Sequence, residues 1–158
     1  MKIYETNYEK FFIHYNLAKF ISQTIIQQFY FLSILLNTLT GLTLVFNSYT
    51  DKTKDSLKNV PDFFTNNTFK LVIGILCCFT ALIKLLTSFP GSILIMGDLL
   101  PAVVGVLGGI AVLIDYYMNN SPSETKLNPK LETVFITNKK YIGIICVFSA
   151  LLHFLFPR

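Results

Sequence analysis

The residues in this sequence with the clearest chemical potential are an amine, a carboxylate and an imidazole in apolar surroundings. Lys84, Asp98 and His153 each lie in or beside a long apolar run. A charged side chain costs on the order of 3 kcal/mol in the centre of a bilayer, so such groups usually pair with one another or mark an ion pathway. These three residues are therefore the candidate functional groups, provided that the surrounding elements bring them together.

Lys84 and Asp98 flank a turn signal, Pro90-Gly91. Lys84 lies six residues before Pro90 and Asp98 lies eight residues after it. With a helical rise of 1.5 Å per residue, both would lie about 9–12 Å from the turn. The spacing predicts an intramembrane ion pair across a helical hairpin. The alternative is two separate charges at the membrane interface, with the long Lys84 side chain reaching water.

Asp98 is also a candidate proton or cation site, the role that intramembrane acids play in transporters. His153 is the candidate relay, and the alternative places it at the interface near the end of the last apolar run. The sequence contains no zinc-ligand spacing, no HExxH or GxSxG motif and no phosphate loop. We therefore expect no enzyme activity, no cofactor and no metal.

The composition indicates a membrane protein. Hydrophobic residues make up 53% of the 158 residues and charged residues only 14%, against about 25% charged in a typical soluble domain. Four apolar runs approach the length of a bilayer crossing. The sequence predicts an all-α, integral membrane four-helix bundle in a single domain, with spans at about 29–46, 69–88, 93–117 and 141–156.

Residues 1–28 mix aromatic side chains with lysines, which is typical of the membrane–water interface. We expect an interfacial amphipathic helix that leads into the first span, and the alternative is an outward extension of that span. Within the first span, Ser33, Asn37 and Thr40 lie on one side at 100° per residue. This polar stripe is expected to face protein or water and not lipid.

The third apolar run has two interpretations. In one, a helix from about Ile93 to Tyr117 is kinked, because Pro101 cannot donate to the Gly97 carbonyl. In the other, the helix begins at Asp98 as its N-cap, and Pro101 lies in the first turn, where proline is tolerated.

Both interpretations place small residues on the face that carries Asp98. Ala102, Gly105 and Gly109 share this face, and the last two form a GxxxG pair. Small residues at this spacing predict a close helix contact. Further along the run, Asp115 is expected to face the interface. Beyond it, Asn128-Pro129 is expected to cap a short helix.

The charge distribution suggests an orientation and excludes one class of partner. The two polar loops and the start of the second span hold eight lysines, and the two terminal segments hold four basic residues. The positive-inside rule then predicts cytoplasmic loops, as in a bacterial inner membrane or its equivalent. The net charge of +4 is too dispersed for nucleic-acid binding.

The expected function is that of a non-catalytic subunit or scaffold of a larger membrane complex. The alternative is a small oligomeric transporter or channel that uses Asp98. The expected partners are the lipid bilayer and either other membrane subunits or further copies of this chain.

Overall fold

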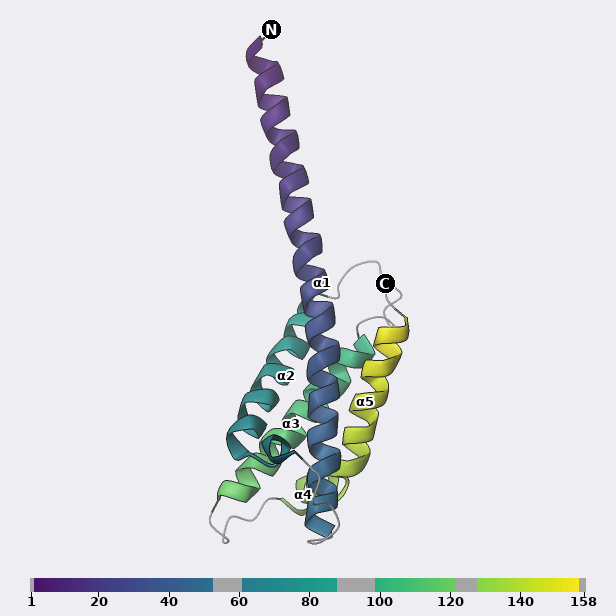
Figure 1. The fold of residues 1–158 in the computed structure, drawn as a ribbon. Helices are drawn as coiled ribbons and strands as arrows, with labels where there is room; N and C mark the ends of the chain where they lie inside the picture. Colours follow the sequence, from purple (N-terminus) through teal and green to yellow (C-terminus); the bar gives the residue numbers. More distant parts are fainter. Residues whose placement is uncertain (1, 53–60, 88–98, 122–127, 157–158) are drawn as a thin grey trace. The chain divides into compact units, whose positions relative to one another are not determined.

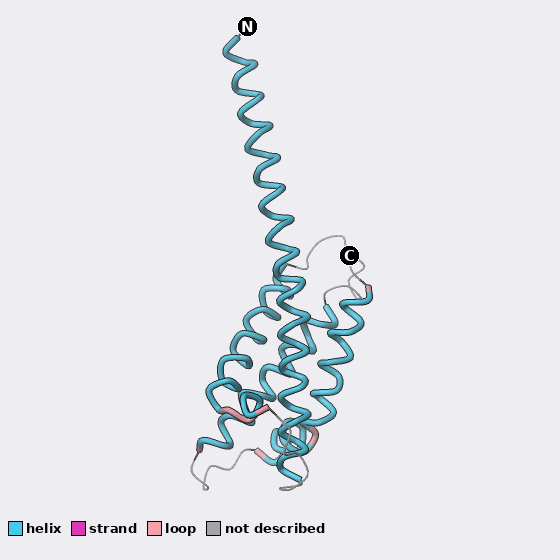
Figure 2. Tube along the Cα trace, in the orientation of Figure 1, coloured by secondary structure: helices cyan, strands magenta, loops and turns pink. Residues whose placement is uncertain are grey.

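The computed structural model describes residues 2–52, 61–87, 99–121 and 128–156. These residues are almost entirely helical and contain no strand (Figure 2), which confirms the predicted all-α class. The chain divides into two units, Met1–Phe31 and Leu32–Arg158. Each unit is described by itself.

Three of the helices are long and apolar enough to cross a membrane, within Lys10–Tyr49, Asn67–Leu86 and Leu100–Asn120. A bent pair, Pro129–Thr137 with Lys139–Leu155, would make a fourth if it counts as one span. By length and composition, the described chain has the helices of a membrane protein.

Helix α1 runs from Lys2 to Lys52 without a break. The sequence predicts an interfacial helix at 1–28 that leads into a span at 29–46, whereas the structure has one helix over both. The reason is local, because no glycine or proline occurs before Gly41 and nothing ends the helix earlier. In the first unit this helix is the only described element, and its described side chains from Lys10 to Ile25 are exposed.

Helices α2 (Asn67–Thr87) and α3 (Leu100–Asn120) pack against each other in opposite directions. Gly74 lies against Gly109, and Ala81, later in α2, lies against Gly105, earlier in α3. Within α3 as described, Pro101 lies in the first turn, where proline is tolerated. The predicted turn at Pro90-Gly91 lies outside the described residues, as do Gly97 and Asp98.

The second polar region contains the predicted short helix. Helix α4 (Pro129–Glu132) begins behind Asn128, whose side-chain oxygen accepts from the Lys130 amide at 3.1 Å, so the predicted cap is confirmed. A π-helical turn, η3 (Thr133–Thr137), follows, and the chain bends by 53° into α5, Lys139–Leu155. A short 3-10 helix, η1 (Asp62–Phe64), precedes α2.

The second unit packs the end of α1 with α2, α3 and α5 around one interior (Figure 1). Small residues set the closest approaches. A Cβ on Gly41 would lie 2.6 Å from the Gly143 carbonyl oxygen, and a Cβ on Gly143 would lie 2.7 Å from the Gly41 oxygen. Bulky side chains such as Phe79 and Phe148 point outward and are exposed. This division suits helices whose outer faces meet lipid.

Candidate functional site

The interior of the second unit is unusually polar for a chain of this composition. On α1, Ser33, Asn37, Thr40, Thr43 and Asn47 are all buried. Their spacing of three and four residues places them on one helical face. The stripe at 33–40 was predicted to face protein or water and not lipid. It is buried in protein, which confirms the prediction.

Asn37 joins three helices through its amide group. Its Nδ2 donates to the Pro101 carbonyl of α3 at 2.9 Å, and the Cys77 thiol of α2 donates to its Oδ1 at 3.4 Å. A Cβ on Gly105 would lie 2.8 Å from the same Oδ1. Glycine therefore fits at position 105 because the Asn37 amide occupies the space that a larger side chain would need.

Ala102, Gly105 and Gly109, the small residues predicted to line one helix face, are all buried in the structure. A Cβ on Gly109 would lie 2.5 Å from the Cys78 sulfur and 3.0 Å from the Gly74 oxygen. These neighbours belong to α2 of the same chain. Whether the GxxxG pair acts as a packing signal in its own right stays a prediction.

At one end of this interior, Asp115 is held between two lysines. Lys70 Nζ lies 2.7 Å from its Oδ2, and Lys139 Nζ lies 2.8 Å from its Oδ1. All three side chains are nearly excluded from solvent, with 4–6% of their surface exposed. The cluster ties the beginning of α2, the end of α3 and the beginning of α5 together, and one carboxylate neutralises one of its two cations.

The expectation that Asp115 faces the interface is wrong, because its carboxylate is buried. The sequence carried a signal for this burial. Gly105, Gly108, Val112 and Asp115 recur at intervals of three and four, so Asp115 extends the buried face of α3. The two lysine partners have no such local signal, since they come from other helices.

At the opposite end, Lys84 and His153 meet. Lys84 Nζ of α2 lies 2.8 Å from His153 Nε2 of α5, and both side chains are buried. Both side chains are therefore covered by protein, and their level relative to the membrane interface stays a prediction. The contact is a hydrogen bond between the two nitrogens, and the protonation of the pair sets which one donates. The pair of Lys84 with Asp98 stays a prediction, because Asp98 lies outside the described residues.

The interior of the second unit buries charged groups at both of its ends, and the hydroxyl and amide groups of α1 are buried in the same interior. Within the described ranges, no group of three or more His, Cys, Asp or Glu residues is placed to hold a metal ion. Cys77, Cys78 and Cys146 are free thiols, and Cys77 and Cys146 are buried. Such an interior can stabilise helix contacts, and it can also bind or pass small ions.

Comparison with known proteins places the chain in a family. A relative from Treponema pallidum (strain Nichols), described as an uncharacterized protein, is 29% identical over 128 residues, which cover 81% of this chain and 93% of the relative. No solved structure matches the chain. A protein-family model matches residues 26–153, a range that contains both buried polar ends and excludes the first 25 residues. The chain belongs to the family that this model describes.

Proposed function

We propose that this protein is a non-catalytic subunit of a larger membrane assembly and that it contacts its partner through the first part of α1. The observation that carries the proposal is the exposure of Phe11 and Phe20, at 72% and 68%. These residues are nine positions apart, which is about 900° of helical rotation, so they point in opposite directions. A flat membrane surface covers one side of a helix and would leave the other aromatic ring in water.

The length of the apolar part of α1 supports the same proposal. The helical stretch Lys10–Tyr49, which contains the candidate span, is 40 residues long, whereas one bilayer crossing takes about 20. The part that is not in the bilayer still carries large apolar side chains, and a second protein helix would cover them. The family match begins at residue 26, so the residues of the proposed contact, Phe11 and Phe20, lie outside the matched range.

The glycine contacts bear on where a partner binds. Gly41, Gly74 and Gly109 all meet helices of this same chain. Their close contacts are therefore made within the chain. We instead assign the partner contact to the exposed aromatic helix. A second copy of the chain is one candidate partner.

Site-specific photo-cross-linking in native membranes tests the proposal. A photoreactive amino acid replaces Phe11 in one variant and Phe20 in another, and Phe79 of α2, which is 59% exposed, is the matched control. We expect protein adducts from both positions of α1 and lipid adducts from position 79. Protein adducts from only one of the two α1 positions would fit an interfacial helix and would contradict the proposal.

A second candidate function is ion or proton transport by a small oligomer, and the buried charges favour it. Lys70, Asp115 and Lys139 at one end and Lys84 with His153 at the other are joined by the polar face of α1. Purified protein in liposomes would then show pH-dependent ion flux that Asp98→Asn removes. Asp62→Asn, at an exposed position, is the matched control. Equal flux in both variants would exclude an essential role for Asp98.

The proposed location is a bacterial inner membrane or its equivalent, with the polar loops in the cytoplasm. Lys130 is exposed within α4, in the second polar region, so a cysteine in its place would be accessible to a label. Labelling of Lys130→Cys by a membrane-impermeant reagent should occur in inverted vesicles and fail in intact cells. The reverse pattern would place the loops outside.

A further inference from the structure

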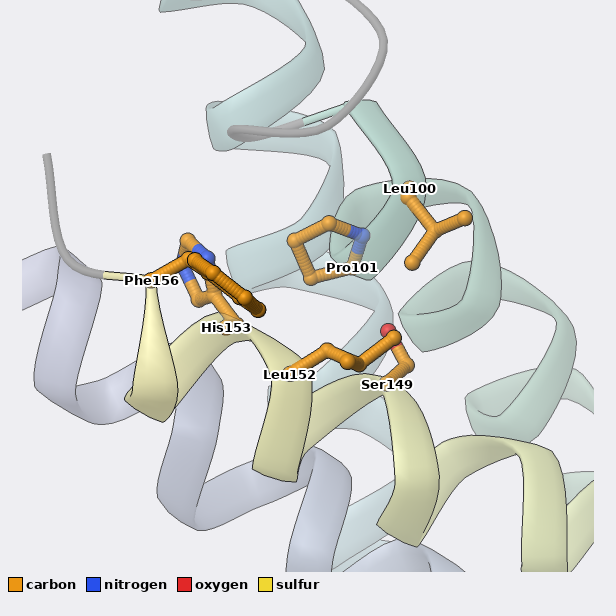
Figure 3. Close-up of a pocket in the computed structure, with 6 residues that line it drawn as sticks. All are labelled: Leu100, Pro101, Ser149, Leu152, His153 and Phe156. Carbon is orange, nitrogen blue, oxygen red and sulfur yellow. The ribbon is translucent and has the colours of Figure 1, made fainter.

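A cavity of about 250 Å³ lies between the first turn of α3 and the last turns of α5. Figure 3 shows its walls: Leu100, Pro101, Ser149, Leu152, His153 and Phe156. Apart from a hydroxyl and an imidazole, these side chains are apolar. The volume equals that of roughly eight water molecules, which suits part of one hydrocarbon chain and is too small for a whole lipid.

Ser149 supplies an unsatisfied hydroxyl in this apolar wall. Its side chain is 2% exposed, and its Oγ has no hydrogen-bond partner among the described residues. Hydroxyls inside helices commonly donate to their own backbone. Thr38 and Thr43 do so, at 2.8 and 2.7 Å from the carbonyl four residues earlier. The Ser149 oxygen instead points toward Leu100 and Pro101 across the cavity (Figure 3).

A buried polar group normally has a partner, because leaving it without one is unfavourable. The partner must fit an apolar space and offer a hydrogen-bond acceptor or donor at one point. The cavity also lies where α3 begins and α5 ends. In a helix that crosses a bilayer, this is the level at which the hydrocarbon gives way to the polar headgroup region.

We propose that this cavity binds one acyl chain of a membrane phospholipid, with the Ser149 hydroxyl donating to the ester carbonyl oxygen. Leu100, Leu152 and Phe156 contact the methylene groups next to the ester. His153 forms part of the same wall and keeps its contact with Lys84. The site belongs to the second unit alone and is independent of the partner proposed for α1.

The protein contains no tryptophan, so one introduced tryptophan reports on a single place. Phe156→Trp puts the reporter at the cavity, and Phe148→Trp puts the control on an exposed part of α5 outside it. Both variants are reconstituted in bilayers with a small, increasing fraction of phospholipid that carries brominated acyl chains, which quench tryptophan. Thermal unfolding of each variant verifies that it is folded.

We expect quenching of the Phe156→Trp reporter to saturate at a low brominated fraction, while quenching of the control rises in proportion to that fraction. Adding Ser149→Ala should weaken the saturable binding about threefold to tenfold, as expected for one lost hydrogen bond. Adding Ser149→Leu, which removes the hydroxyl and puts a larger side chain into the cavity, should abolish it. Thr38→Val, which removes a hydroxyl bonded to its own helix, should change nothing.

Three results would overturn the proposal. Equal, proportional quenching of both reporters would mean contact with bulk lipid only. Saturable quenching that Ser149→Ala leaves unchanged would remove the assigned hydrogen bond. Quenching by a brominated free fatty acid but not by the brominated phospholipid would assign the cavity to a carboxylic acid and not to an ester.

Discussion

The two ends of the second unit both bury amines but surround them differently. At one end, Lys70 and Lys139 each contact one carboxylate oxygen of Asp115, at 2.7 and 2.8 Å. At the other end, Lys84 lies 2.8 Å from an imidazole nitrogen of His153, and that imidazole also forms part of a cavity wall. A carboxylate cancels positive charge, whereas an imidazole carries no negative charge to do so.

This difference separates a structural role from a ligand-binding role. Asp115 uses both of its oxygens to fasten α2, α3 and α5 at the end where these helices meet the polar loops. His153 contacts Lys84 on one side and faces a space that a ligand can enter on the other. We therefore expect substitutions at the first end to change stability, and those at the second to change binding more than stability.

The largest effect is expected from Asp115→Asn. This change leaves Lys70 and Lys139 buried without their carboxylate, and breaking a buried ion pair typically costs about 3–5 kcal/mol. The expected result is a large fall in the thermal unfolding midpoint in detergent. Asp62→Asn removes a carboxylate at an exposed position and should leave the midpoint within error. A small effect of Asp115→Asn would mean that the cluster does not hold the helices together.

Replacing Lys70, Asp115 and Lys139 together distinguishes a cluster that only stabilises the helix contacts from one that binds ions. In the triple variant Lys70→Met, Asp115→Leu and Lys139→Met, no buried charge of the cluster remains, and such replacements are often neutral in stability. We expect recovery of most of the stability that Asp115→Asn loses. If the folded triple variant lost ion flux that the wild-type chain shows in liposomes, the cluster would belong to a transport path. Its role would then not be purely structural.

A smaller loss of stability is expected from a substitution between the two ends, where glycines set the distance between helices. Gly41→Ala adds a methyl group that would lie 2.6 Å from the Gly143 carbonyl oxygen, so α1 and α5 must move apart. Overpacking of this kind costs about 1–3 kcal/mol. The unfolding midpoint measures it, with Leu82→Ala on the exposed face of α2 as the control. An unchanged midpoint in Gly41→Ala would show that this contact is loose.

A double-mutant cycle measures the Lys84–His153 contact. We expect Lys84→Met and His153→Phe to be coupled by on the order of 1 kcal/mol, because either change alone removes the same hydrogen bond. The corresponding cycle of Lys84→Met with Asp98→Asn tests the ion pair predicted from the sequence. Additive losses in that second cycle would exclude the Lys84–Asp98 pair.

The smallest effect is expected from Ser149→Ala in lipid-free detergent. The Ser149 hydroxyl has no hydrogen-bond partner in the described part of the chain, so its removal should change the unfolding free energy by less than about 0.5 kcal/mol. In bilayers the same variant should be destabilised relative to wild type, since bound lipid stabilises only a chain that binds it. Equal behaviour in both media would argue against a bound lipid.

The sequence alone determined the class and the local elements. Apolar runs predicted the spanning helices, because an apolar run is a property of a continuous segment. Asn128-Pro129 predicted its short helix for the same reason, since a cap acts over three residues. The burial of the polar stripe at 33–40 could be predicted because helical periodicity alone places these residues on one face.

Only the tertiary structure decided which polar groups meet. Asp115 contacts Lys70 and Lys139 across 45 and 24 residues of sequence, and Lys84 contacts His153 across 69. A hydrogen bond requires its two atoms to lie within a few tenths of an ångström of the right distance. The rotation and register of each helix set that distance, and they result from the summed packing of all helices in the bundle. Periodicity could therefore place Asp115 on the buried face of α3, but it could not name the lysines that neutralise it.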